Sequence, residues 1–159
     1  MTMKKLIFIF IAGFSLAGCI KNRTTECKPT TVTVQAPASE ITALSQYLTQ
    51  NLISATADDR GFFYTVTVPG TGAKPNTCNS IGIDYVAKLT NGTTVDSANN
   101  VVFPLNQLIT SLQEALPLIN VGSSIILYSP PSLAYGIAGQ GPVPANANLV
   151  FSIKLHSIN

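Results

Sequence analysis

The sequence predicts an α+β fold, with several antiparallel strands and one short helix laid across one face of the sheet. From Gly61 onward, short apolar runs are separated by turn residues, as is typical of antiparallel sheets. In segment 105–116 the apolar residues recur at spacings of three and four, the period of an amphipathic helix. Apolar and polar residues alternate over 149–155, which predicts a final strand with one buried face.

The first 18 residues predict a secretory signal peptide. Lys4 and Lys5 precede an uncharged apolar run, which is too short to span a bilayer, and small residues stand before Cys19. The letters LAGC at 16–19 resemble a bacterial lipobox, which implies that Cys19 is acylated and anchors the protein to a membrane of the cell envelope. Basic and polar residues follow Cys19, which favours the outer membrane, with the protein facing the periplasm.

Charge excludes nucleic acid as a partner. The chain has nine Lys and Arg against seven Asp and Glu, and cleavage after residue 18 removes two of the basic residues and none of the acidic ones. The mature chain is therefore close to neutral and has no basic patch to neutralise phosphates.

Cys27 and Cys78 remain after Cys19, and in an exported chain we predict that they form a disulfide. The alternatives are two separate thiols, or a bond from one of them to another protein. There is no CxxC pair, and His156 is the only histidine, so the sequence predicts no metal site and no cofactor.

Residues 19–38 are rich in Lys, Thr and Pro and are interpreted as a tether. Ser39 is expected to cap a helix whose apolar residues recur at helical spacing over 41–52. Its apolar stripe can dock on the domain or form a homodimer with a second copy, and docking is the favoured alternative. Asp58, Asp59 and Arg60 are expected to form a solvated break before the domain.

The first strands are predicted at 62–68 and 81–89, and Asn91-Gly92 predicts a tight hairpin turn after the second. The return strand is expected over 93–97, with Asp96 at its end, before a polar, irregular stretch at Asn99 and Asn100. An extended run at 101–105 follows.

The helix predicted over 105–116 is limited by Pro117 and ends by Gly122, and 123–128 is the next strand. The segment before the last strand contains four prolines, so it is expected to be a shaped loop, with Tyr135 inside it. In the last strand Phe151 points inward, whereas His156 faces solvent.

Familiar catalytic arrangements are absent from the sequence. The single histidine makes a Ser-His-acid triad implausible, and no Lys-Ser/Thr pair follows the loop glycines to form a phosphate site. What remains is an aromatic and aliphatic pocket with one carboxylate, which suits an apolar ligand or a reaction that needs no nucleophile.

Five motifs follow one another along the chain: Pro69-Gly70-Thr71-Gly72, Asp84-Tyr85, Val95-Asp96-Ser97, Leu133-Ala134-Tyr135-Gly136, and Val143-Pro144 followed by Leu149-Val150-Phe151. In order and spacing they resemble the FKBP-type peptidyl-prolyl isomerases, over about residues 61–159. The resemblance implies a bent antiparallel sheet wrapped around the short helix. The chain then divides into a signal peptide (1–18), a tether (19–38), an N-terminal helix and linker (39–60) and an isomerase domain (61–159). The lipoprotein tether is similar to that of exported family members from Bacteroidetes.

The resemblance also implies a proline pocket and the residues that form it. The implied catalytic residues are Tyr85, Asp96, Ile109, Tyr135 and Phe151. The implied substrate-binding residues are Val95, Phe103, Leu108, Leu112 and Val143. The Ile109 N–H and the Tyr135 hydroxyl would hold the carbonyls that flank the proline, and Asp96 would bond towards Tyr85. Proline-containing unfolded or exported polypeptides and the family's macrolide ligands are the implied partners, and the implied role is assistance in the folding of exported proteins.

Three positions differ from the family's usual pattern. Val95 replaces a phenylalanine, Leu112 replaces a tryptophan on the pocket floor, and an arginine usual after the aspartate is absent between Ala98 and Val102. The first two changes predict a larger, less aromatic cavity and slower catalysis. The alternative function is therefore a proline-binding chaperone module with little or no turnover.

Overall fold

The computed structural model describes residues 27–29 and 33–159. The predicted signal peptide at 1–18, the lipidation site at Cys19 and part of the predicted tether lie outside the described residues. None of the helices in the described ranges is long and apolar enough to cross a membrane.

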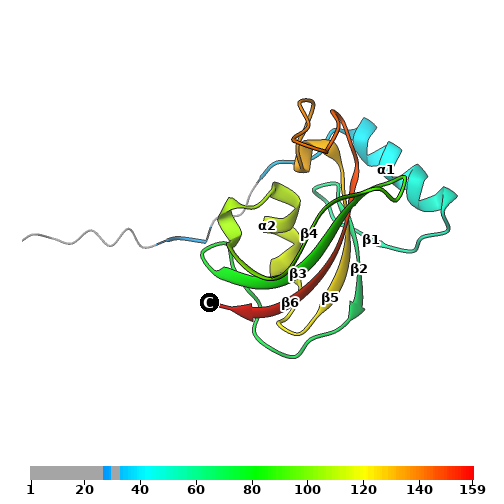
Figure 1. Cartoon of the computed structure of the whole chain (residues 1–159). Helices are drawn as coiled ribbons and strands as arrows, with labels where there is room; N and C mark the ends of the chain where they lie inside the picture. Colours follow the sequence, from blue (N-terminus) through cyan, green and yellow to red (C-terminus); the bar gives the residue numbers. More distant parts are fainter. Residues whose placement is uncertain (1–26, 30–32) are drawn as a thin grey trace, which may run out of the picture.

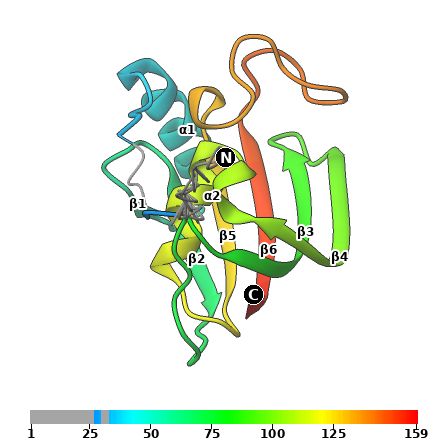
Figure 2. The same ribbon diagram turned by 90° about the vertical axis from the view of Figure 1, so that its left-hand side faces the viewer.

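A six-stranded antiparallel sheet, in the order β1-β2-β5-β6-β3-β4, forms the body of the domain (Figure 2). The strands are β1 Thr56–Ala57, β2 Phe63–Val68, β3 Ser80–Leu89, β4 Thr94–Pro104, β5 Ser124–Ser129 and β6 Leu149–Ile158. The alternation predicted for the last strand is present in β6, where Leu149, Phe151, Ile153 and Leu155 are buried. The α+β fold predicted from the sequence is confirmed.

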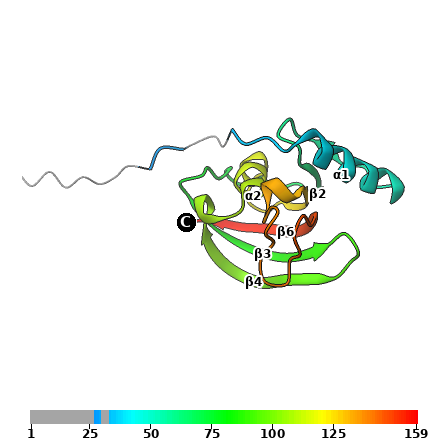
Figure 3. The same cartoon turned by 90° about the horizontal axis from the view of Figure 1, so that it is seen from above.

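The two helices are α1 (Ala38–Gln50) and α2 (Thr110–Ala115). Short 3₁₀ turns are η1 Leu105–Gln107, η2 Leu116–Leu118 and η3 Pro131–Leu133. Figure 1 shows α1 and α2 on opposite sides of the sheet, and Figure 3 shows the sheet curving around α2. Alternation along β5 explains this arrangement, because Ile125 and Leu127 belong to the core under α2, whereas Ile126 and Tyr128 contact α1.

The continuous helix predicted over 105–116 is wrong. Leu108 and Ile109 are extended, with ψ of 170° and 153°, so the turn η1 is separated from α2. The Gln113 side-chain amide donates to the Leu108 carbonyl at 2.6 Å and stabilises this break. The helix ends at Ala115, ahead of Pro117, and the glycine expected to end it lies beyond η2.

The end predicted for the return strand at Asp96 is also wrong, because β4 continues through a bulge. The register shifts between the Tyr85 pair with Ala98 and the Ile83 pair with Val101, and Asn100 has a φ of 52°. The Asp84 carboxylate accepts a hydrogen bond from the Asn100 N–H at 2.7 Å, which satisfies the bulged backbone. Asp96 therefore lies inside a long strand.

His156 has a partner that the sequence did not predict. Its Nε2 lies 2.8 Å from Oδ2 of Asp84, and its side chain is only 31% exposed. The Asn100 N–H and then the His156 side chain lower the pKa of Asp84. His156 thus supports the bulge of β4 instead of simply facing solvent.

Helix α1 begins one residue before the predicted cap, Ser39, whose side chain makes no cap bond. The carbonyl of Pro37 instead accepts the Glu40 N–H at 3.0 Å. Leu44 and Leu48 are buried against Tyr128, so the favoured alternative, docking on the domain, is what the structure shows. Of the apolar stripe over 41–52, which was the alternative surface for a homodimer, Leu44 and Leu48 are covered by this chain, whereas Leu52 is 94% exposed.

The segment before α1 is fixed to the domain at its described positions. Cys27 and Cys78 form the predicted disulfide, with their Cα atoms 5.7 Å apart. The Ala36 N–H donates to the Arg60 carbonyl at 2.9 Å, and Ala36 is buried.

The break expected at 58–60 is not simply solvated. The Arg60 guanidinium hydrogen-bonds both carboxylate oxygens of Asp58 and pairs with Glu114 of α2. The bond to Arg60 lowers the pKa of Asp58.

Candidate active site

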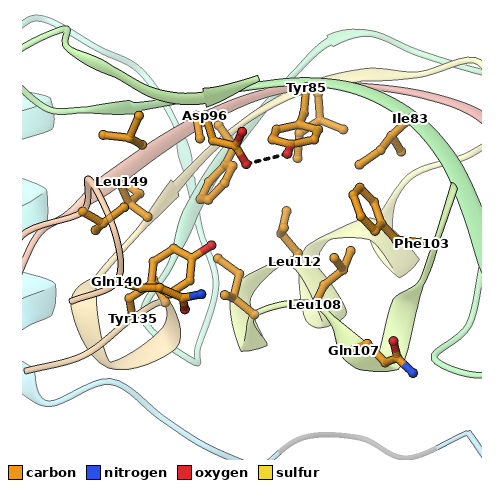
Figure 4. A pocket seen from close by; sticks show the side chains of 17 residues that line it. Ile83, Tyr85, Asp96, Phe103, Gln107, Leu108, Leu112, Tyr135, Gln140 and Leu149 are labelled. Carbon is orange, nitrogen blue, oxygen red and sulfur yellow. Dashed lines mark hydrogen bonds between the residues drawn. The ribbon is translucent and has the colours of Figure 1, made fainter. Parts of the chain in front are cut away.

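A pocket of about 460 Å³ lies between α2, the strands β3, β4 and β6, and the loop after η3 (Figure 4). The structure places all ten residues predicted to act on or bind substrate around it: Tyr85, Val95, Asp96, Phe103, Leu108, Ile109, Leu112, Tyr135, Val143 and Phe151. They come from five separate parts of the chain: β3, β4, the segment 108–112, the loop after η3, and β6. The fold therefore assembles the residues that the sequence motifs indicated.

Tyr85 and Asp96 form the polar pair of the pocket. Asp96 sits opposite Ala87 across the β3–β4 ladder, so it shares a face with Tyr85 two residues away. The Tyr85 hydroxyl donates to Oδ2 of Asp96 at 2.6 Å, and the Ser97 N–H donates to Oδ1 at 2.8 Å. Burial, followed by the Asp96 carboxylate, raises the pKa of Tyr85 to about 12. Tyr85 is therefore a neutral donor locked onto the carboxylate.

Tyr135 lies on the other side of the pocket, on the proline-rich loop (Figure 4). Gly136 takes a φ of 63°, its N–H donates to the Pro131 carbonyl at 2.8 Å, and its carbonyl accepts the Asn146 N–H at 3.0 Å. These bonds shape the loop around Tyr135. Burial, with a smaller contribution from the Asp96 charge, raises the pKa of Tyr135. Its hydroxyl donates to no group within the described part of the chain, so it is available to a ligand.

Ile109 supplies a second available donor, through its backbone. Its extended conformation (φ −60°, ψ 153°) precedes the first turn of α2, where N–H groups have no helical acceptor. The Ile109 carbonyl accepts the Leu112 and Gln113 N–H groups, whereas its own N–H donates to none of residues 27–29 and 33–159. The break that the sequence did not predict is thus what leaves this donor free.

Apolar side chains form the rest of the wall. Phe103 packs edge-on against Tyr85 at 6.3 Å between ring centroids, and Phe151 is 4% exposed. Leu112 reaches the pocket from α2, and Val95 from β4. Both are aliphatic, so the aromatic lining is confined to Tyr85, Phe103, Tyr135 and Phe151.

Sequence reasoning missed seven lining residues: Ile83, Ala87, Gln107, Ala134, Gln140, Leu149 and Ile153. Four of them share the strand phase of Tyr85 or Phe151, so alternation alone was a sufficient signal. Ala134 adjoins Tyr135 in the quoted motif. The two glutamines carried no signal, because exposed glutamines in turns are common.

The chemistry available in this pocket is binding without covalent catalysis. Asp96 is the one charged side chain that lines it. No cluster of three metal-ligating side chains occurs among the residues that the structure describes. A neutral, apolar group flanked by carbonyls fits the lining, because Ile109 and Tyr135, which carry the two free donors, line a largely apolar cavity.

Comparison with known proteins gives one family. Residues 72–156 match the FKBP-type peptidyl-prolyl cis-trans isomerase family. The chain is 41% identical over 104 residues to the "FKBP-type peptidyl-prolyl cis-trans isomerase FkpA" of Aeromonas hydrophila, covering 63% of this chain and 39% of that protein. It is 35% identical over 103 residues to the "Outer membrane protein MIP" of Legionella longbeachae, covering 62% and 44%.

A solved structure shows the same fold. The crystal structure of FkpA from Escherichia coli superposes with a TM-score of 0.70 at 27% identity, covering 77% of this chain and 60% of that chain. The chain spans less than half the length of the two curated relatives, 39% and 44%.

Proposed function

The chain belongs to the FKBP-type peptidyl-prolyl cis-trans isomerase family, and from this premise we propose that its pocket catalyses rotation about Xaa-Pro bonds. The observation that carries the proposal is the pair of free donors, the Ile109 N–H and the Tyr135 hydroxyl, on an apolar pocket. The substrates we propose are proline-containing unfolded or exported polypeptides, and the family's macrolides are the proposed ligands.

The reaction requires no nucleophile. Rotation about an Xaa-Pro bond faces a barrier of about 18 to 20 kcal/mol, because amide resonance is lost in the twisted form. That form is less charge-separated than the planar amide, so an apolar pocket that removes water from the imide favours it. Fixed donors then select the twisted geometry over the planar ground state.

The residues of the pocket fit these two tasks. Phe151 and Leu112 are buried apolar residues that would surround the proline ring and exclude water. The Ile109 N–H and the Tyr135 hydroxyl would bind the flanking carbonyls. Tyr85, held on Asp96, would keep the carboxylate in place at the wall of the pocket.

Measurement of cis-to-trans conversion of a prolyl peptide tests the proposal. The full chain should accelerate conversion, and Tyr135→Phe should lower kcat/KM about tenfold, since one hydrogen bond formed in the transition state is removed. Tyr47→Phe, which removes a hydroxyl on α1 outside the pocket, is the matched control and should leave the rate unchanged. A spontaneous rate at high protein concentration would contradict the proposal.

A second candidate function is a proline-binding chaperone module with little turnover. It is favoured by Val95 and Leu112, whose aliphatic side chains leave proline with fewer rings to stack on. Under this function the chain suppresses aggregation of an unfolded protein without accelerating proline-limited folding. If the double variant Tyr135→Ala, Asp96→Ala lost the suppression, holding would depend on the pocket and would not be an independent activity.

We also propose an outer-membrane lipid anchor through Cys19, with the domain facing the periplasm. The sequence pattern at 16–19 and the similarity to a protein named for the outer membrane support it. Mass spectrometry of the mature N-terminus should find an acylated Cys19. An unmodified cysteine in the membrane-extracted protein would contradict the anchor.

A further inference from the structure

Helix α1 contacts the loop that carries Tyr135, although it lies outside the family match at 72–156. An Oε2 atom of Glu40, in the first turn of α1, accepts a hydrogen bond from the Ser132 N–H at 2.9 Å. The two residues are 92 positions apart in the sequence. Ser132 is the middle residue of η3, three residues before Tyr135. Figure 2 shows the α1 ribbon next to the start of this loop.

The Ser132 N–H is a donor that the loop itself does not satisfy. Pro130 and Pro131 have no N–H, and the Leu133 and Ala134 N–H groups bond to the carbonyls of those two prolines. The first N–H of such a turn has no partner within it. The hydroxyl of Ser132 is buried without a hydrogen bond in the described part of the molecule, so it does not act as the cap. Glu40 takes this role.

Glu40 is itself held in place by packing. Leu44 and Leu48, on the next turns of α1, are buried against the sheet with exposed fractions of 0% and 5%. In the first turn of α1, Ile41 packs closely on Gly61: a Cβ added to Gly61 would lie 2.8 Å from the Ile41 side chain. The carboxylate therefore projects from a fixed helix.

The loop is also fixed from the opposite side of the sheet. The Ser129 and Ser111 hydroxyls, both fully buried, are 2.8 Å apart and join the end of β5 to α2. The start of the Tyr135 loop is thus bonded to α2 through Ser129 and to α1 through Ser132. Ile109 lies immediately before α2. The Ser129–Ser111 bond therefore links the loop that carries the Tyr135 hydroxyl to the helix that follows the Ile109 N–H. The Glu40–Ser132 bond holds the turn that precedes Tyr135.

We infer that Glu40 is a positioning residue for the isomerase, and that α1 is part of the machinery that holds the Tyr135 hydroxyl in register with the Ile109 N–H. This inference rests on the proposed function. Small displacements of groups that act in a transition state are costly, so loss of the Glu40 bond lowers kcat more than it changes KM.

The variants Glu40→Ala and Glu40→Gln separate positioning from helix stability. Both remove a negative charge from the first turn of α1, so both lose the same favourable interaction with the helix N-terminus. Only Gln keeps an oxygen that can accept the Ser132 N–H. We expect Glu40→Ala to lower kcat about threefold to tenfold, whereas Glu40→Gln stays within about twofold of wild type. Thr42→Ala, at an exposed position of the same helix, should change nothing.

A double-mutant cycle identifies the residue through which Glu40 acts. In a Tyr135→Phe background, Glu40→Ala should have no further effect, because the hydroxyl that it positions is already gone. If the wild type is active, three results would overturn the inference and leave the proposed function intact. They are an unchanged kcat in Glu40→Ala, a kcat in Glu40→Gln as low as that in Glu40→Ala, and additive losses in the cycle. If the wild type is inactive, the proposed function fails instead, and the inference is then decided by proline-peptide affinity, which Glu40→Ala should reduce and Glu40→Gln should retain.

Discussion

At the scale of single residues, the pocket depends on two tyrosines that stay neutral. Burial raises the pKa of both Tyr85 and Tyr135, and the Asp96 carboxylate adds to the effect. A neutral hydroxyl can donate to Asp96 or to a substrate carbonyl, whereas a phenolate can only accept. The carboxylate thus helps to keep both hydroxyls protonated.

Activity should therefore be independent of pH from about pH 6 to pH 9, below the ordinary tyrosine pKa of about 10. We expect kcat/KM for a prolyl peptide to fall only in more alkaline solution. A bell-shaped dependence of kcat/KM on pH, with activity already falling near neutral pH, would contradict the roles given to the tyrosines.

The raised pKa of Tyr85 should also make the free energy of unfolding depend on pH. The pKa of Tyr85 is about 12 in the folded protein, whereas the pKa of an unfolded tyrosine is about 10. Its contribution to the free energy of unfolding is therefore complete below about pH 10 and is lost between about pH 10 and pH 12. In denaturant unfolding, the free energy of unfolding should fall more steeply over this pH range for the wild type than for Tyr85→Phe, because only the wild type carries the ionising hydroxyl.

At the scale of elements, the break between η1 and α2 could not be predicted from the sequence. Leu105, Leu108, Ile109 and Leu112 keep the helical period because all of them face the core or the pocket, so periodicity could not reveal the extended pair at 108–109. The bulge in β4 was concealed similarly, because Asp84, which stabilises it, belongs to a different strand. Strands with a buried face and the pocket motifs were predictable, whereas partners distant in sequence were not.

Ile109→Pro tests the break directly. The observed φ of −60° suits proline, and the extended Leu108 suits the residue before a proline. The substitution removes the free N–H with little cost to the fold. We expect kcat/KM to fall about tenfold to a hundredfold while Tm changes little. Ile109→Val, which keeps the N–H, is the control; equal activity of both variants would exclude the backbone donor from the reaction.

The disulfide is the element that ties the N-terminal segment to the domain. Cys27 and Cys78 are separated by 51 residues, and closing a loop of this length stabilises a fold by about 4 kcal/mol in the chain-entropy account. The double variant Cys27→Ser, Cys78→Ser should therefore lose about 2 to 4 kcal/mol in denaturant unfolding. Activity below the unfolding transition should stay within about twofold, because neither cysteine lines the pocket. Unchanged stability would show that the bond constrains nothing.

At the scale of the whole molecule, α1 and the family domain form one unit. The sequence pattern and the family resemblance set residues 39–60 apart from 61–159, yet α1 covers the sheet and bonds to the Tyr135 loop. These contacts join residues far apart in the chain, so local patterns could not predict them. The ten predicted pocket residues could be recognised from motifs along the chain, whereas Gln107, Gln140 and the supporting helix α1 lie in no such motif.

Nuclear magnetic resonance of a prolyl peptide at equilibrium tests the central claim most directly. A catalyst speeds exchange between the cis and trans signals without changing their populations, whereas a protein that only binds proline does not speed exchange. With the full chain at a small fraction of the peptide concentration, we predict faster cis-trans exchange at unchanged populations, and much weaker acceleration with Tyr135→Phe. Exchange no faster than in peptide alone would contradict the isomerase.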